Sequence, residues 1–222
     1  MKADVSGASS PNLATPAPIA IVGMACMFPQ APDLAAFWNN IIGAVDAIGE
    51  PAPGWDAERY LACGRIKTQF GGYLRDLYRF DPREFGIMPN SMDGGEPDQF
   101  LALRVARDAL VDAGYFGPEV DHRDTGVILG HSTYLHRGQV TVIQTDIVID
   151  QTLEVLRAAM PQIDEAALAR VRTMLAKKIP PMNADTAPGL VPNVMTGRIA
   201  NRLNLKGPNY LCLLYTSPSP RD

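Results

Sequence analysis

Two short runs of apolar, mostly β-branched residues predict buried strands. They cover residues 19–22, which end at Gly23, and residues 125–130, where glycines bound the apolar core of the run. A third strand is predicted at Tyr210, after a turn over residues 205–208. Longer segments with helical spacing separate these runs. Strands that alternate with helices predict a layered α/β domain with a largely parallel inner sheet.

Capping residues and apolar spacing predict helices around the strands. Asp33 is expected to begin a helix that ends at Gly43, and Pro97 to begin one that continues through about Ala113 and ends at Gly114. A third helix is expected over residues 190–202. The apolar positions expected to face the interior are Leu34, Phe37, Trp38 and Ile41 in the first, Leu101, Val105, Ala109 and Leu110 in the second, and Val194, Ile199 and Leu203 in the third.

The connections between these helices are rich in glycine and proline. Residues 49–72 are therefore predicted to be mostly loop. Tyr73 and Leu74 are expected to begin a short extended piece. Asp81 and Pro82 are expected to open a single helical turn that continues through Phe85.

Residues 139–179 carry two conflicting signals. The β-branched content of residues 140–149 would suit a strand by propensity alone. The apolar spacing, however, continues at nearly 3.6 residues without a turn, which favours one helix to about Met160. Asp164 is expected to cap a second helix that ends at Pro180-Pro181. Its apolar side is predicted to carry Leu168, Val171, Met174 and Leu175.

Composition narrows the classes of function. The chain has 222 residues, of which 46% are hydrophobic and 20% charged, and its formal net charge is −4. That balance gives no indication of a nucleic-acid or anionic-membrane partner, and no apolar run approaches the roughly 20 residues of a membrane-spanning helix. Residues 1–17 are rich in Ser, Pro, Ala and Thr and are predicted to be a disordered leader or linker. A soluble cytoplasmic protein is the simplest interpretation.

The residues that carry chemistry form no familiar site. Cys26, Cys63 and Cys212 lie far apart, without metal-type spacing, and their odd number argues against a disulfide framework. His131 and His136 follow a strand, where α/β sites gather, but a locally bonded or solvated loop is the plainer interpretation.

Two further patterns bear on anion binding. Residues 126–130 lack the pattern of a phosphate-binding loop. Arg198 and Arg202 share a helical face and suggest an anion site, although a solvated or salt-bridged face is favoured. The sequence assigns no catalytic, cofactor-binding or metal-binding residue.

Ten short motifs follow one another in a fixed order over residues 18–211. They are Pro18–Pro29 with its Gly-Met and Phe-Pro, Phe37-Trp38, Asp46–Ile48, Trp55-Asp56, Gly71–Leu74, Phe80-Asp81, Glu84–Ile87, Glu96–Gln99, Ala109–Tyr115 and Thr196–Tyr210. Each motif alone is common, but the ordered set resembles the β-ketoacyl synthase domain of polyketide and fatty-acid synthases, with single-chain polyketide-type synthases closer.

The resemblance implies a fold and a reaction. The fold would be thiolase-like, a five-layered α/β/α/β/α arrangement of which residues 18–211 supply most of the N-terminal half. The reaction would be a decarboxylative Claisen condensation between acyl and malonyl thioesters. These are carried on the phosphopantetheine arm of an acyl carrier protein, with no cofactor bound directly, and the full-length protein would be a homodimer.

The resemblance also implies where the nucleophile should stand. Counted from Gly207-Pro208, the family's catalytic cysteine would fall at Thr216, and Cys212 would fall four positions earlier, at a strand residue. Residues 212–222 are therefore interpreted as an aberrant tail that is not native sequence. The chain as given is expected to be catalytically inactive and poorly stable.

Alternatives remain open within this resemblance. A ketosynthase-like subunit without the cysteine could have a structural, tunnel-shaping role beside an active partner. A decarboxylating or chain-initiating variant is a third interpretation. The stretch from 131 to 181 is longer than its counterpart in the family, and would be either an insertion near the substrate tunnel or dimer interface, or a surface excursion without function.

Overall fold

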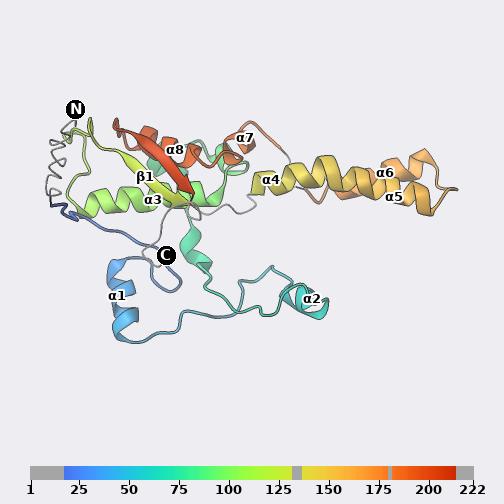
Figure 1. The fold of residues 1–222 in the computed structure, drawn as a ribbon, viewed down its shortest axis with the longest axis horizontal. Helices are drawn as coiled ribbons and strands as arrows, with labels where there is room; N and C mark the ends of the chain where they lie inside the picture. Colours follow the sequence, from blue (N-terminus) through green and yellow to red (C-terminus); the bar gives the residue numbers. More distant parts are fainter. Residues whose placement is uncertain (1–17, 132–136, 180–181, 214–222) are drawn as a thin grey trace, which may run out of the picture.

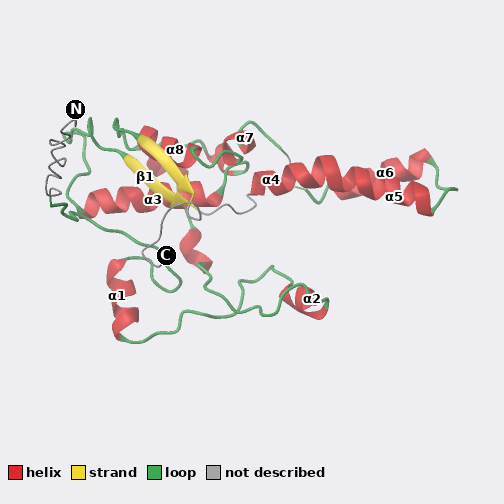
Figure 2. Ribbon diagram, viewed as in Figure 1, coloured by secondary structure: helices red, strands yellow, loops and turns green. Residues whose placement is uncertain are grey.

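A computed structural model describes residues 18–131, 137–179 and 182–213 (Figure 1). A small α/β body, a projecting helical hairpin and a loop-rich N-terminal region make up this part of the chain (Figure 2). The α-helices are α1 (Leu34–Ile42), α2 (Ala57–Ala62), α3 (Pro97–Asp112), α4 (Arg137–Val142), α5 (Ile149–Ala159), α6 (Glu165–Ala176), α7 (Thr186–Gly189) and α8 (Val194–Arg202). The strands are β1 (Val127–His131) and β2 (Asn209–Leu213), 3₁₀ turns cover Arg75–Tyr78, Pro82–Phe85 and Pro89–Met92, and a π-helix covers Ile143–Val148.

The body is built on a parallel pair of strands. β1 and β2 pair in the register Val127 to Asn209 through His131 to Leu213, which confirms the parallel arrangement and both C-terminal strand predictions. Helix α8 packs against both strands and against α3. The core between them is apolar and well buried; it contains Phe85, Ile87, Phe100, Leu103, Val127, Met195, Ile199, Ala200, Leu203 and Leu205.

Helix α3 starts at Pro97 and is followed by Gly114 in a left-handed conformation, as expected. The predicted apolar stripe was wrong in part, because the helix turns Gln99, Phe100 and Leu103 into the core. Leu101, Val105 and Ala109 are only partly buried. The N-terminal segment occupies part of that flank, since a Cβ on Gly23 would lie 2.6 Å from the Ala109 carbonyl oxygen.

The strand expected over residues 19–22 does not form. These residues have no strand hydrogen bonding, and the side chains of Ile19 and Ile21 are 95% and 80% exposed. A strand needs a neighbour for its backbone groups, and in the described part of the chain the sheet contains only β1 and β2. The segment is held by α3 instead, where the Met24 amide donates to Asp112 Oδ2 over 2.8 Å.

In the N-terminal half, the sequence predicted the ends of helix α1 correctly but not which of its side chains are buried. Asp33 caps α1 by accepting from the Ala36 amide, and Gly43 follows the helix as predicted. Trp38 and Ile41 are nevertheless more than half exposed, so α1 does not bury the apolar side expected of it. The helical turn after Asp81 is confirmed.

Residues 49–72 are mostly loop, as predicted, but they also contain the short helix α2, which Asp56 caps through the Arg59 amide. The extended piece expected from Tyr73 is instead followed at once by a 3₁₀ turn, Arg75–Tyr78. In both places a short helical segment is stabilised by capping or by contacts elsewhere in the chain, which overall glycine and proline content does not reveal.

The helical hairpin projects from the body (Figure 1). Helix α4, the π-helix and α5 follow one another without a break, so the helical interpretation of residues 140–160 is confirmed over the strand. Helix α6, capped by Asp164 as predicted, packs against α5. Met174, expected on the packed side, is 66% exposed. The predicted stop at Pro180-Pro181 lies outside the described residues.

The hairpin has an apolar core of its own. Ile149, Leu153 and Leu168 are buried there. Side chains packed around them are Leu156, Ile163, Val171, Leu175 and Ile179. The helix expected over residues 190–202 is shorter than predicted, because α8 starts at Val194 and the separate short helix α7 precedes it. Within α8, Ile199 is buried as expected, whereas Val194 is only partly so.

Candidate functional site at the carboxyl end of β1

The carboxyl end of β1 meets the first turn of α3, and this junction holds the main polar cluster of the body. His131, the last residue of β1, and Asp98, in the first turn of α3, approach with His131 Nε2 and Asp98 Oδ2 2.8 Å apart. The histidine side chain is 15% exposed. A carboxylate at a helix N-terminus interacts favourably with the helix dipole, so α3 and His131 both orient Asp98.

Glu96, the residue before α3, is 4% exposed. Its Oε1 accepts a 2.7 Å hydrogen bond from the Gly138 amide at the base of the hairpin. Gly189 packs close to it, because a Cβ on that glycine would lie 3.0 Å from Glu96 Cγ. Glu96 and Asp98 therefore join α3 to the hairpin base and to the end of β1, respectively.

Gln99 extends the cluster towards α8. This side chain is 2% exposed; its Nε2 donates to the Pro188 carbonyl oxygen over 3.2 Å, and its Oε1 accepts from Arg198 Nε over 3.3 Å. The Arg198 guanidinium also lies over the Phe100 ring, 4.8 Å from its centre. Gln99 thus uses both ends of its amide to fix neighbouring elements.

For the two arginines of α8 a solvated or salt-bridged face was favoured, and Arg202 is exposed whereas Arg198 is partly buried. Among the described residues neither forms an ion pair. Burial, and then the positive charge of Arg202, lower the pKa of Arg198. Arg202 donates from Nη1 to the Gly86 carbonyl oxygen over 2.9 Å. Both arginines therefore act here as hydrogen-bond donors that join α8 to other segments.

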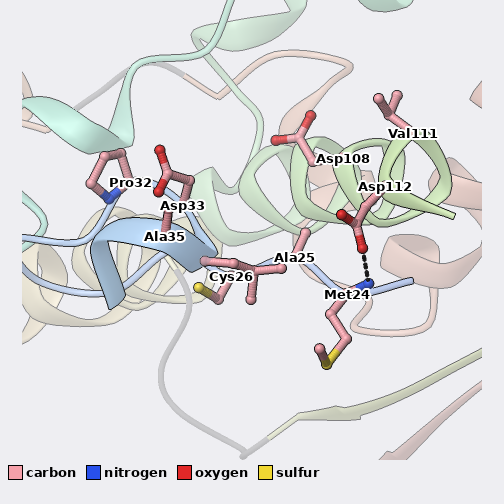
Figure 3. Close-up of a pocket in the computed structure, with 10 residues that line it drawn as sticks. Met24, Ala25, Cys26, Pro32, Asp33, Ala35, Asp108, Val111 and Asp112 are labelled. Atoms are coloured by element: carbon pink, nitrogen blue, oxygen red, sulfur yellow. Dashed lines mark hydrogen bonds between the residues drawn. The ribbon is translucent and has the colours of Figure 1, made fainter. Parts of the chain in front are cut away.

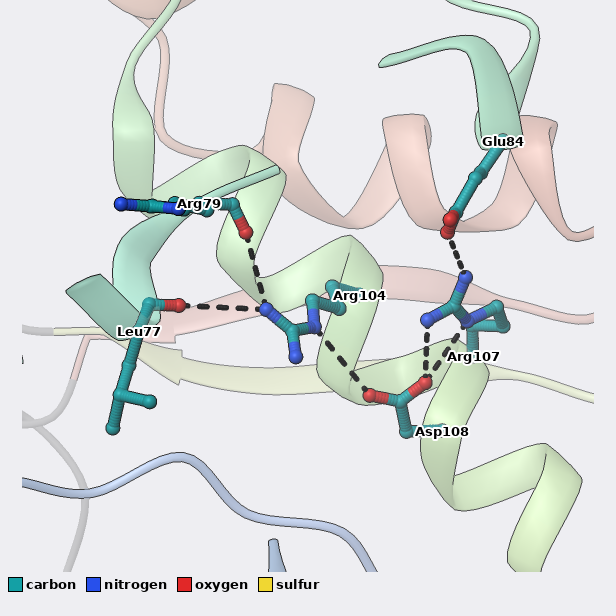
Figure 4. A network of polar contacts seen from close by, with 6 residues as sticks. All are labelled: Leu77, Arg79, Glu84, Arg104, Arg107 and Asp108. Atoms are coloured by element: carbon teal, nitrogen blue, oxygen red, sulfur yellow. Dashed lines mark hydrogen bonds and ion pairs between the residues drawn. The ribbon is translucent and has the colours of Figure 1, made fainter. Parts of the chain in front are cut away.

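A second polar network lies on another face of α3 (Figure 4). Arg104 donates from Nη1 to the carbonyl oxygens of Leu77 and Arg79 and pairs with Asp108. Arg107 pairs with Glu84 and Asp108 and lies over the Phe85 ring. This network attaches the loop of residues 77–85 to α3 and has a structural role.

The three cysteines lie in different surroundings. Cys212 lies in β2 opposite Gly130 and is exposed, which agrees with the strand position that the motif count gave it. Cys63 donates from Sγ to the Tyr60 carbonyl oxygen over 3.5 Å. A reactive thiol needs a positive neighbour or a helix N-terminus that lowers its pKa.

Cys26 lines a pocket of about 320 Å³ between α1 and the C-terminal part of α3 (Figure 3). Burial, and then the negative charge of Asp33, raise the pKa of its thiol. The pocket also carries Asp108 and Asp112. Cys26 is better suited to packing than to nucleophilic attack.

Metal binding finds no support in the described ranges, which contain no group of three or more His, Cys, Asp or Glu side chains arranged to hold an ion. His136 lies outside these ranges, as does Thr216. In the same part of the chain, no helix has both the length and the apolar character needed to cross a membrane.

Comparison with known proteins identifies the family. The family model for the N-terminal domain of β-ketoacyl synthases matches residues 17–212. The chain belongs to the β-ketoacyl synthase family. Sequence relatives of this ketosynthase chain include polyketide synthase PksR of Bacillus subtilis, 36% identical over 50% of the chain. A phenolphthiocerol/phthiocerol polyketide synthase of Mycobacterium tuberculosis is 31% identical over 77% of it.

Solved ketosynthases share the fold. The ketosynthase of module 6 of the Bacillus subtilis bacillaene synthase superposes with a TM-score of 0.58 at 22% identity, over 86% of this chain. The oxazolomycin ketosynthase domain of Streptomyces albus gives 0.59 at 23% identity. The fold is thus the thiolase-like one of ketosynthases. The chain spans 26% and 29% of these two structures, and 4% and 9% of the two sequence relatives.

The sequence singled out His131 but not its partner. Asp98, Glu96 and Gln99 stood in the motif Glu96–Gln99 that carried the family resemblance, without an individual role. The usable signal was three polar residues around the start of a helix that must bury one face. Their partners, Gly138, His131, Pro188 and Arg198, come from distant parts of the chain.

Proposed function

We propose that this chain is part of a ketosynthase that elongates acyl chains in polyketide biosynthesis. In that reaction a cysteine thiolate accepts an acyl group from the phosphopantetheine arm of an acyl carrier protein. A malonyl thioester then loses CO₂, and the resulting carbanion attacks the acyl-cysteine carbonyl carbon. The new carbon–carbon bond releases the cysteine thiolate and leaves a β-ketoacyl thioester on the carrier. The match to the family model over residues 17–212 carries this proposal.

The residues of this chain would have a structural role in the ketosynthase rather than a catalytic one. The polar cluster around Glu96, Asp98 and Gln99 joins α3 to the hairpin base, to β1, to α7 and to α8. The motif count puts Thr216 at the position of the family's catalytic cysteine, so the chain by itself would be inactive. We assign the ketosynthase domain to residues 18–211, a leader to 1–17 and an aberrant tail to 212–222.

The partners follow from the same proposal. Acyl carrier protein would deliver both substrates, and two copies of the full-length protein would form a homodimer in the cytoplasm. Large apolar side chains on the open face of the sheet support a further packing partner, since Ile128 and Tyr210 stand opposite each other and are 62% and 52% exposed. Soluble proteins rarely leave contiguous apolar surface uncovered without an interaction reason.

The deciding experiment begins with genomic DNA. The gene is read through and beyond codon 211, independently of the present sequence, and the encoded protein is assayed for CO₂ release and β-ketoacyl formation from malonyl and acyl carrier proteins. The proposal expects a cysteine motif after β2 and both products, lost when that cysteine is changed to Ala. If residues 213–222 and the stop are confirmed and no product forms, the enzyme proposal is wrong and a cysteine-less accessory subunit takes its place.

A further inference from the structure

The helical hairpin consists of a fixed base, an independent tip and a segment that belongs to neither. The base is α4, where the Gly138 amide bonds to buried Glu96. A Cβ on Gly138 would lie 2.9 Å from Leu190 Cδ2, so the base is also packed tightly against the residue after α7. The base therefore moves with the body.

The tip, α5 with α6, is held together internally. Its apolar core is separate from that of the body. Two ion pairs cross between its helices: Arg157 with Glu165, at 2.8 Å between Nη2 and Oε2, and Arg172 with Asp150. Apolar packing along both helices and charge pairs at two levels predict that the tip moves as one unit.

The π-helix Ile143–Val148 lies between these two units. The Ile149 amide donates to the Gln144 carbonyl oxygen five residues earlier, which marks the wider π turn. None of the six side chains belongs to either buried core, and Ile143, Ile147 and Val148 are 38%, 47% and 46% exposed. Little apolar burial would be lost if this segment changed its geometry.

Two threonine hydroxyl bonds cross the ends of the π-helix, one from Thr145 within it and one from Thr152 in α5. Thr145 donates from Oγ1 to the Thr141 carbonyl oxygen over 2.8 Å, and Thr152 donates to the Val148 carbonyl oxygen over 2.6 Å. A threonine hydroxyl bonded to the carbonyl four residues earlier tends to bend a helix. Isolated π turns concentrate at functional positions in helices. At each end, therefore, a side-chain hydroxyl already bonds to a backbone carbonyl oxygen and can keep that oxygen satisfied if the backbone hydrogen bonds change.

We propose that the π-helix is a hinge about which the tip pivots as a rigid unit relative to the body. This inference does not depend on the proposed condensation activity. The hydroxyls of Thr145 and Thr152 hold the flanking carbonyls while the backbone bonds between them exchange. The hinge would allow the tip to take different positions relative to the body without loss of either core.

Amide hydrogen exchange on the full chain tests the first part of the proposal. Amides of residues 143–148 are expected to exchange about tenfold faster than those of α4 and α5, which flank them. Equal protection throughout residues 137–159 would overturn the hinge. Loss of protection across the whole tip together would overturn it too, because the tip would then unfold locally rather than pivot.

Deletion of Gln144 tests the second part. An α turn closes with one residue fewer than a π turn, so the deletion should convert the segment to α-helix and leave the register on either side unchanged. Gln144→Ala keeps the length and is the matched control. Spin labels on genetically encoded azide-bearing residues at the exposed positions 162 and 206 report the separation of tip and body, and leave the cysteines untouched.

The distance distribution between the two labels is expected to be broad in the native chain and in Gln144→Ala, and at least about twofold narrower in the deletion variant. The deletion variant should also lose the fast exchange of residues 143–148 while α5 and α6 keep their protection. Equal widths in all three proteins would overturn the proposal. If the deletion variant does not fold, the exchange pattern of the native chain still decides, since protection of residues 143–148 equal to that of α5 overturns the hinge.

Discussion

Gln99 shows how one buried amide can join three elements. Gln99→Leu is expected to lower the free energy of unfolding by about 1–3 kcal/mol, because the Pro188 carbonyl oxygen and the half-buried Arg198 each lose a hydrogen-bond partner. Urea denaturation followed by circular dichroism measures the loss. Gln162→Leu, at an exposed position of the tip, is the control and should change stability by less than about 0.5 kcal/mol. Equal effects of the two substitutions would mean that the Gln99 bonds contribute nothing.

The thiol of Cys26 should report on the charge of its pocket. Its pKa is raised by burial and by Asp33, so less thiolate is present at any given pH below that pKa. Asp33→Asn removes the negative charge but keeps a capping side chain for α1. The pKa of Cys26 should fall, and its reaction with a thiol reagent at pH 8 should accelerate.

The rates are measured as a function of pH in a background where Cys63 and Cys212 are changed to Ser. Burial is the larger cause of the raised pKa, so only part of the shift should disappear. An unchanged midpoint of the pH profile in Asp33→Asn would exclude the carboxylate as a cause.

A residue's role could be predicted from the sequence where its partner lies close by along the chain, and not where the partner is distant. Asp33, Asp81 and Asp164 could be predicted as caps because a side chain and an amide two or three residues away decide each one. The partners of Gln99 could not, because they stand 89 and 99 residues away in sequence. The burial that makes such bonds valuable exists only after α3, α7 and α8 have packed.

Replacing Gly23 or Gly197 with alanine is expected to change the stability of the chain in opposite directions. A Cβ on Gly23 would lie 2.6 Å from both the Ala109 carbonyl oxygen and Ala113 Cβ. Gly23→Ala should therefore push the N-terminal segment from α3 and cost about 1–3 kcal/mol. A Cβ on Gly197, inside α8, meets nothing within 4 Å, so Gly197→Ala should stabilise the chain by up to about 1 kcal/mol.

Thermal or urea unfolding of the two variants side by side measures the difference in sign. The same substitution is made in both, so general effects of an added methyl group cancel. A stabilising or neutral Gly23→Ala would show that the segment of residues 18–24 is not held close to α3 as the structure places it.

At the scale of elements, helices were more predictable than strands. The helical spacing of residues 97–112 or 149–159 is complete within the segment itself. A strand over residues 19–22 requires a neighbour, which residues 19–22 cannot specify, and in the structure these residues form no strand, while Met24, just after them, bonds to α3. The apolar stripe of α3 was displaced for a related reason, because a helix packed on more than one side has no single apolar face.

The described part of the molecule contains two apolar cores, and damage to one should spare the other. Leu168 is 2% exposed in the hairpin core. Leu168→Ala should cost about 2–5 kcal/mol and abolish amide protection in α5 and α6, while α3 and α8 keep theirs. Hydrogen exchange resolved by segment checks this. Met174→Ala, on the exposed side of α6, should leave all four helices protected. Simultaneous loss of protection in α3 would show that the cores form one cooperative unit.

The class of the whole molecule was predictable from alternating patterns, and its family from motifs in a fixed order. The projection of the hairpin from the body could not be predicted. An amphipathic helix indicates that its apolar side is packed, but not which element it packs against. Residues 149–176 pack on one another rather than on the body.

The parallel pairing of β1 with β2 also constrains the order in which the chain can acquire its structure. The two strands meet only after residues 132–208 have been closed into a loop, and the entropic cost of closure rises with the length of flexible chain. The hairpin lies within that loop and depends on contacts close in sequence, so it can form early and shorten the flexible path. Variants that destabilise the tip should then slow refolding of the sheet although they touch neither strand, because distant pairings limit folding rates.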